Sequence, residues 1–136
     1  MSTVIPRRGA SPLTWAGRVL FGLVVVFLGF DIVIKLLLIQ PVVDAMAQLG
    51  YSPGFGRVVG VIELASLALY LWPRTAMLGA VLLTAVMGGA IASHARVDDP
   101  LFSHTLFGVY LGLFLWAGVW LRDERLRTLM PWRRDA

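Results

Sequence analysis

Long apolar segments constrain this chain more than any other feature, because a membrane-spanning helix requires about 20 mostly apolar residues. Four segments meet or approach that length: residues 15–39, 55–72, 75–93 and 104–121. The sequence therefore predicts an all-α fold, a bundle of four transmembrane helices. The connecting segment "QPVVDAMAQLGYSPG" places Pro41 at a helix start and Gly50 beyond a helix end. This pattern predicts a short interfacial helix between the first and second spans.

The composition supports a membrane protein and excludes several other classes. Of the 136 residues, 58% are hydrophobic and only 15% are charged, which is far from the composition of a soluble domain. The absence of cysteine excludes disulfides, thiolate metal sites and thiol redox chemistry. The net charge of +4 comes from arginines that gather near the two ends of the chain. Membrane topology explains these arginines, so no nucleic-acid partner is expected.

Basic residues predict the orientation of the bundle. With four spans, both termini lie on the side of the turn at residues 72–75, and nine arginines belong to that side. We therefore expect a multi-pass protein of the cell inner (plasma) membrane with both termini in the cytoplasm. The expected parts are an N-terminal tail (1–14), a membrane domain (15–121) and a basic C-terminal tail (122–136).

Two further expectations concern the ends of the chain. The first apolar run is longer than the roughly 7–15 residues of a signal-peptide core, so it is expected to be a retained transmembrane helix. The C-terminal segment "RDERLRTLMPWRRDA" mixes five arginines with apolar residues. This mixture predicts binding to anionic lipid at the cytoplasmic face.

The first span carries two charges, which a lipid-facing helix avoids. Seventeen of residues 19–39 are Val, Leu, Ile or Phe, and only Asp31 and Lys35 are charged. The apolar residues favour insertion by roughly 5–10 kcal/mol, and the two charges oppose it by roughly 5–7 kcal/mol, so the span still inserts. The i, i+4 spacing allows the two side chains to pair on one helix face. Lys35 is also close enough to the outer end of the bundle to reach Glu63 of the second span.

Ionisable residues gather in the outer half of the predicted bundle. They are Asp31, Lys35, Glu63, His94, Arg96 and His104. Ionisable residues inside a membrane face the bundle interior or a wet cavity, and they mark functional sites by default. These residues are therefore predicted to form a ligand-binding site. The alternative is a set of inter-helix salt bridges that fix the packing without chemistry, and the sequence leaves both open.

The chemistry of this site is only partly constrained. His94 and His104 invite a metal site with Asp98 or Asp99, but no metal-ligand spacing exists on one helix, so no metal is expected. The two histidines and Arg96 would instead suit an anionic or carbonyl-bearing head group. The sequence has no phosphate-binding loop, nucleophile elbow or dinucleotide fingerprint, so no catalytic residue is assigned.

Small residues predict close helix contacts. Ala80, Thr84, Gly88 and Ala92 repeat every four residues on the third span, and Gly108 and Gly112 form a G-x-x-x-G pair on the fourth. Such faces serve packing within the bundle or association of two copies of the chain.

Several stretches resemble the DoxX-like family of small four-helix membrane proteins. They are "GFDIVIKL", the segment that runs from "PVVDAM" through "GVIE" to "AIASH", and "DPLFSHTLFGVYLGLFLW". The resemblance spans about residues 17–121. The matching features are Lys35, Glu63, the turn at residues 73–79 and His94. The resemblance implies association with redox enzymes, since the family is named for a subunit of a thiosulfate:quinone oxidoreductase. Distant relatives resemble cargo receptors and receptor-assembly chaperones.

Two hypotheses for function follow. In the first, the protein binds a lipophilic small molecule, a quinone or a lipid, in a polar pocket that opens to the extracytoplasmic side. It would then serve as the membrane subunit of a redox assembly. In the second, it is a non-enzymatic assembly factor or chaperone whose buried charges are structural. A transporter is the weakest reading, because four helices without an inverted repeat do not favour it.

Overall fold

The computed structural model describes residues 11–131, and this part of the chain is helical without strands. The expectations for Arg7, Arg8, Trp132, Arg133 and Arg134 fall outside it. The elements are α1 (Pro12–Leu37), α2 (Gln40–Gln48), α3 (Phe55–Leu71), α4 (Ala76–Arg96), the π-helical turn η1 (Leu101–Thr105), α5 (Phe107–Arg122) and α6 (Glu124–Leu129). The all-α prediction is confirmed.

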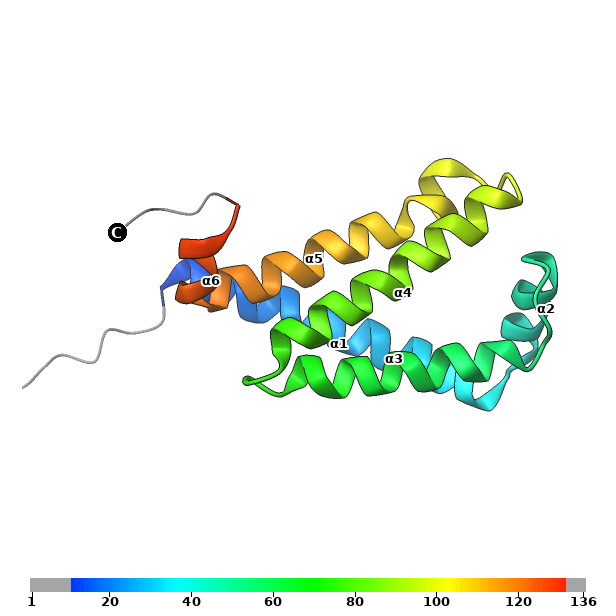
Figure 1. Ribbon diagram of the computed structural model, residues 1–136, viewed down its shortest axis with the longest axis horizontal. Helices are drawn as coiled ribbons and strands as arrows, with labels where there is room; N and C mark the ends of the chain where they lie inside the picture. The colour runs from blue at the N-terminus through cyan, green and yellow to red at the C-terminus, as the bar shows by residue number, and fades with distance from the viewer. Residues whose placement is uncertain (1–10, 132–136) are drawn as a thin grey trace, which may run out of the picture.

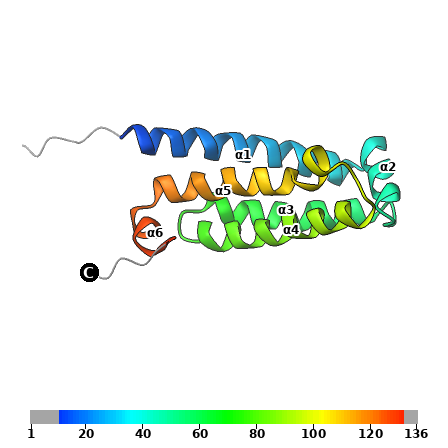
Figure 2. The ribbon, with the colours of Figure 1, turned by 90° about the horizontal axis from the view of Figure 1, so that it is seen from above.

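Four long helices lie side by side with alternating direction, so that the chain runs back and forth along the bundle (Figures 1 and 2). α1 packs against α3 and α5, and α4 packs against the same two helices. The short helix α2 lies across one end of the bundle, whereas α6 and the start of α1 lie at the opposite end (Figure 1). The turn from α3 to α4 belongs to the α6 end, and the turn from α4 to α5 belongs to the α2 end.

Three helical segments are long and apolar enough to cross a bilayer: Pro12–Leu37, Ala76–Arg96 and Leu101–Arg122, the last of which joins η1 to α5. α3 has 17 residues and is shorter than each of these three segments. The outer surface of the bundle is apolar, as Val26 (73% exposed) and Phe30 (64% exposed) illustrate on α1. Large exposed apolar surfaces of this kind suit contact with lipid.

The break between α1 and α2 follows from local chemistry. Leu38 ends α1 in the left-handed conformation, with φ of 51°, and Pro41 lies in the first turn of α2, where its missing N–H has no cost. Gly50 follows α2 with φ of 76°. The predicted short helix is therefore present. Part of its apolar face, Val42 and Leu49, is buried, so this face packs onto the end of the bundle.

The half of the bundle near α6 is densely packed around Tyr70 of α3, whose side chain is only 1% exposed. The Tyr70 hydroxyl donates a hydrogen bond to the carbonyl of Leu115 on α5 at 3.0 Å. A Cβ atom at Gly79 of α4 would lie 2.2 Å from the Tyr70 backbone nitrogen. Only glycine allows this approach of α4 to α3 directly after the turn.

Glycines also bring α1 and α3 together at the α2 end. Gly56, Gly60 and Glu63 lie on one buried face of α3, as their spacing of four and three residues requires. A Cβ atom on Gly60 would lie 3.0 Å from the Cβ atom of Lys35. The missing side chain at position 60 therefore lets the stem of Lys35 pass close to α3.

The predicted glycine contacts on the last span are also present. A Cβ atom on Gly108 would lie 2.9 Å from Ile91 on α4, so α5 packs closely on α4 at this point. Gly88, by contrast, has nothing within 4 Å of its would-be Cβ atom. Thr84, Gly88 and Ala92 are exposed, whereas Ala80 of the same face is buried. Association of two copies through this face stays a prediction.

The close approach at Gly60 is testable with a matched pair of substitutions. Gly60→Val should lower the free energy of unfolding by about 1–3 kcal/mol, because the added atoms overpack the contact with Lys35. Gly29→Val on α1 is the control, since a Cβ atom there meets nothing within 4 Å. Unfolding of the purified protein in detergent, followed by circular dichroism, measures both. Equal stability of the two variants would contradict the proposed role of Gly60.

Candidate functional site

A cavity of about 570 Å³ lies in the half of the bundle near α2, which is within the range of small-molecule sites. All the helices except α6 contribute to its walls, and most of the lining side chains are apolar. Its polar lining residues are Asp31, Lys35, Tyr51, Glu63, Ser93, His94 and His104. Five of the six residues predicted to form a ligand site therefore line one cavity.

The central feature of this cavity is an ionic triad formed by Asp31, Lys35 and Glu63. The Lys35 ammonium donates to Asp31 Oδ2 at 2.5 Å and to the two Glu63 carboxylate oxygens at 2.8 and 2.9 Å. Asp31 lies one turn before Lys35 on α1, and Glu63 comes from α3. Both of the expected partners of Lys35 are thus found, and they share a single ammonium group.

The triad is partly shielded from solvent and lacks charge balance. The Glu63 side chain is 6% exposed, that of Lys35 17% and that of Asp31 24%. Two carboxylates and one ammonium give a formal charge of −1. Lys35 is the only lysine in the sequence, and it supplies the only formal positive charge of the cavity lining when histidine is counted as neutral. Because buried charges need partners, removal of Lys35 would leave two carboxylates without one.

The two histidines lie at the α4–α5 end of the cavity. Their ring centroids are 5.9 Å apart, as the expectation of facing histidines requires. His94 Nδ1 lies 2.6 Å from Asp99 Oδ2, and His104 Nδ1 lies 2.8 Å from the Ser103 hydroxyl. Residues 11–131 contain no group of three side chains placed to hold a metal ion.

Arg96 lies near the cavity but does not line it. Its guanidinium donates to the backbone carbonyl of Leu49 and lies 5.8 Å from the centroid of the Tyr51 ring. The Tyr51 hydroxyl in turn forms a hydrogen bond of 2.8 Å with the Ser93 hydroxyl. These contacts tie the α2–α3 connection to the end of α4 and hold α2 over the end of the cavity.

Sequence reasoning missed Tyr51 and Ser93. Tyr51 stands in the turn "GYSPG", and its partner is 42 residues away. A lone tyrosine in a glycine- and proline-rich turn signals a turn and does not indicate a contact with a distant helix.

Long apolar helices, an apolar outer surface and charged side chains turned into an internal cavity together define a helical membrane protein with multiple apolar helices. The family model of the DoxX-like family matches residues 19–118. The chain therefore belongs to the DoxX-like family, and the matched region includes every residue of the triad and both histidines. Comparisons with curated proteins and with solved structures gave no match.

Removal of Lys35 should be the most damaging single change in the triad. Lys35→Met should lower the free energy of unfolding by about 3–5 kcal/mol, because it leaves two carboxylates unpaired. Asp31→Asn should change the free energy of unfolding by less than about 1 kcal/mol, since the Lys35–Glu63 pair remains and is neutral. Unfolding in detergent measures both.

A second substitution separates charge from packing in this experiment. Adding Glu63→Gln to Lys35→Met should restore part of the lost stability, because it removes one unpaired charge at nearly constant volume. A double variant that is less stable than Lys35→Met would contradict unpaired charge as the cause of the lost stability.

Proposed function

We propose that the protein binds a lipophilic small molecule, a quinone or a lipid, in the cavity near α2. The observation that carries this proposal is the ionic triad in the wall of an otherwise apolar cavity of about 570 Å³. Ligand sites commonly combine apolar walls with a few polar groups that orient the ligand. In this arrangement the apolar walls hold the body of the ligand and the triad holds its polar head. His94 and His104 lie near the entrance.

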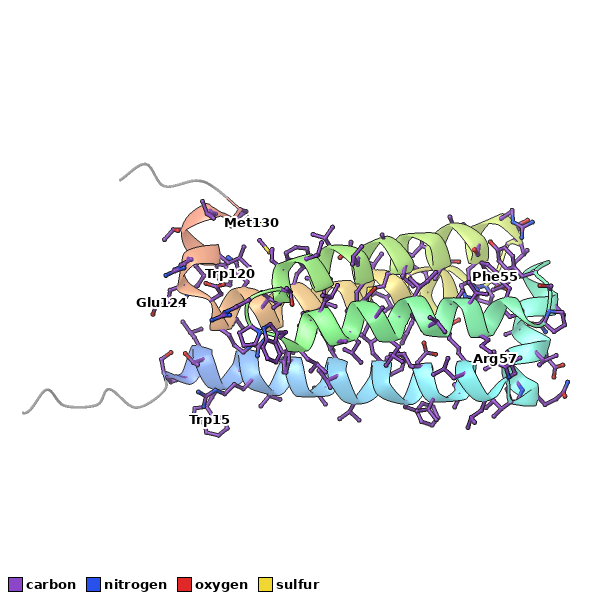
Figure 3. All side chains as sticks on the ribbon, turned by 60° about the horizontal axis from the view of Figure 1, so that its bottom comes forward. Trp15, Phe55, Arg57, Trp120, Glu124 and Met130 are labelled. Carbon is purple, nitrogen blue, oxygen red and sulfur yellow. The ribbon has the colours of Figure 1, made fainter. Side chains whose placement is uncertain are left out.

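The proposal includes a specific arrangement in the membrane. α3 also crosses the membrane, as the second of four spans. The membrane domain extends over residues 15–121 between cytoplasmic tails at 1–14 and 122–136. The start of α1 and α6 lie at the same end of the bundle (Figure 1), together with five of the seven arginines that the structure describes. Trp15 and Trp120 are also at this end (Figure 3), as expected of an aromatic belt.

The opposite end then faces outward. α2 lies there at the membrane interface, and the cavity opens to the extracytoplasmic side of the plasma membrane. Phe55 and Arg57 mark this end of the bundle (Figure 3). Arg57 donates to the carbonyl of Leu36 on α1 at 3.0 Å, which joins the first turn of α3 to the end of α1. A ligand-bound bundle of this kind would serve as the membrane subunit of a redox assembly.

One observation favours a second function, that of a membrane assembly factor or chaperone. The charged groups of the triad pair with one another, so most of their contacts form without a ligand. A protein of this kind would hold no stoichiometric small molecule and would dock a protein partner instead. The following experiment distinguishes the two functions.

Mass spectrometry of lipophiles that copurify with the protein in mild detergent tests the proposal. The wild-type protein should carry a quinone or lipid at about one molecule per chain. Glu63→Gln should bind this ligand at least about tenfold more weakly and carry correspondingly less of it, because a loss of about 1.4 kcal/mol of binding free energy lowers the affinity tenfold. Glu124→Gln is the matched control, since this carboxylate lies outside the cavity on α6, with its side chain 90% exposed.

A wild-type protein that carries no lipophile would contradict ligand binding and favour the assembly factor. Equal ligand content in Glu63→Gln and Glu124→Gln would remove Glu63 from the site while ligand binding itself stands. Circular dichroism of each variant confirms that it is folded.

The orientation is testable because the chain contains no cysteine, so a single introduced cysteine reports its own position. Ser52→Cys, in the connection between α2 and α3, should react with a membrane-impermeant maleimide in intact cells. Thr128→Cys, on the exposed surface of α6, should react only after the membrane is opened. The reverse pattern would place the cavity on the cytoplasmic side.

A further inference from the structure

The triad offers a ligand hydrogen-bond acceptors and no free donor. An ammonium group has three donors, and Lys35 directs its contacts to three carboxylate oxygens: Asp31 Oδ2 and both oxygens of Glu63. What remains for a ligand at the triad is carboxylate oxygen. A head group that can only accept hydrogen bonds, such as a ketone or a quinone carbonyl, finds no partner there.

Asp31 has one carboxylate oxygen that accepts no hydrogen bond from the described residues. Within residues 11–131, Lys35 is the only hydrogen-bond partner of the Asp31 side chain, and it contacts Oδ2. No buried side-chain nitrogen or oxygen in this part of the chain lacks a partner, so the unpaired Oδ1 atom is accessible. Asp31 is also the most exposed member of the triad and lines the cavity. Its second oxygen is therefore available to a ligand.

The charge balance singles out the same residue. Lys35 and Glu63 form a neutral pair, so Asp31 accounts for the formal charge of −1 among the residues that line the cavity, when histidine is counted as neutral. An unbalanced charge in apolar surroundings is costly. A ligand that carries one positive charge would balance it.

Aromatic rings line the same cavity as Asp31. Phe27 lies one turn before Asp31 on α1, and its ring centroid is 5.2 Å from that of Phe107 on α5. Phe27, Phe107, Tyr51 and Phe55 all line the cavity. The faces of aromatic rings attract cations within about 6 Å. A cation held by Asp31 would lie next to such faces.

The space beyond these rings suits a hydrocarbon body. A second, apolar cavity of about 300 Å³ lies between α1 and α5 and shares Phe27, Phe107 and Leu111 with the first. The two cavities therefore meet at the ring pair. A molecule with its head at Asp31 can extend its apolar part past the rings toward the lipid-facing side of α1 and α5.

We propose that the cavity is selective for lipophilic amines, with the protonated amine bound to Asp31 and flanked by Phe27 and Phe107. This inference rests on the proposed function, the binding of a lipophile in this cavity, and it replaces the quinone among the proposed ligands by an amphiphile with a cationic head. It assigns the triad a division of roles, in which the Lys35–Glu63 pair joins α1 to α3 and Asp31 selects the ligand.

The experiment uses three probes of similar size and apolar character that differ in the polar group. Phenylbutylamine carries an ammonium, phenylbutanol a hydroxyl, and benzylacetone a carbonyl. Binding to the purified full-length protein in an uncharged detergent at neutral pH is measured by calorimetric titration. The amine should bind at least about tenfold more tightly than the alcohol, and the ketone should bind most weakly.

Two variants with the same change of charge locate the source of this preference. Asp31→Asn should reduce the preference for amine over alcohol to less than about threefold, because it removes the unbalanced charge. Asp44→Asn is the matched control, since Asp44 lies on α2 outside the cavity lining and pairs with Gln40. Its preference should equal that of the wild type, which excludes an effect of detergent partitioning or of net charge.

The outcomes separate this inference from the function on which it rests. If the alcohol or the ketone binds the wild-type protein as tightly as the amine, or if Asp31→Asn keeps the full preference, selection of amines by Asp31 is wrong while ligand binding stands. If none of the three probes binds and no lipophile copurifies, the proposed function fails as well. The comparison of probes on the wild-type protein decides the preference even if Asp31→Asn does not fold.

Discussion

The contact of Lys35 with Glu63 is the interaction on which the half of the bundle near α2 depends. It joins α1 to α3 inside apolar surroundings, where a charge without a partner is costly. The contact needs the absence of a side chain at Gly60, because a Cβ atom there would lie 3.0 Å from that of Lys35. A glycine on one helix thus permits an ion pair on the next, and the ion pair fixes the wall of the cavity.

The two halves of the bundle differ in packing and in charge. The half near α6 is filled: Gly79 allows α4 to contact the backbone of α3, and the Tyr70 hydroxyl bonds across to α5. The half near α2 is hollow and carries the charges. The contacts of Arg96 with Leu49 and of Tyr51 with Ser93 hold α2 over this hollow end. A densely packed half therefore adjoins a half that contains a cavity.

Much of this arrangement could be predicted, and the successes share one physical basis. The helices agree with the predicted spans to within a few residues, because apolar length and the breaks at Pro41, Gly50 and Pro73 are local properties. The i, i+4 spacing of Asp31 and Lys35 and the nearness of Lys35 to one end of the bundle allowed the contacts with Asp31 and Glu63, but left open whether they form. Arg96 was predicted to join this site because it belongs to the same half of the bundle. It contacts the Leu49 carbonyl instead and does not line the cavity.

The sequence by itself determined the helical segments, the family, and the end of the bundle at which the ionisable residues gather, because these depend on composition and on spacing along one helix. Only the tertiary structure decided that one ammonium serves two carboxylates, that Phe27 meets Phe107, and that a cavity lined by all of these residues remains. These features depend on how closely and at what rotation neighbouring helices pack. That geometry arises from contacts between residues far apart in the chain, such as Gly60 with Lys35 and Tyr51 with Ser93.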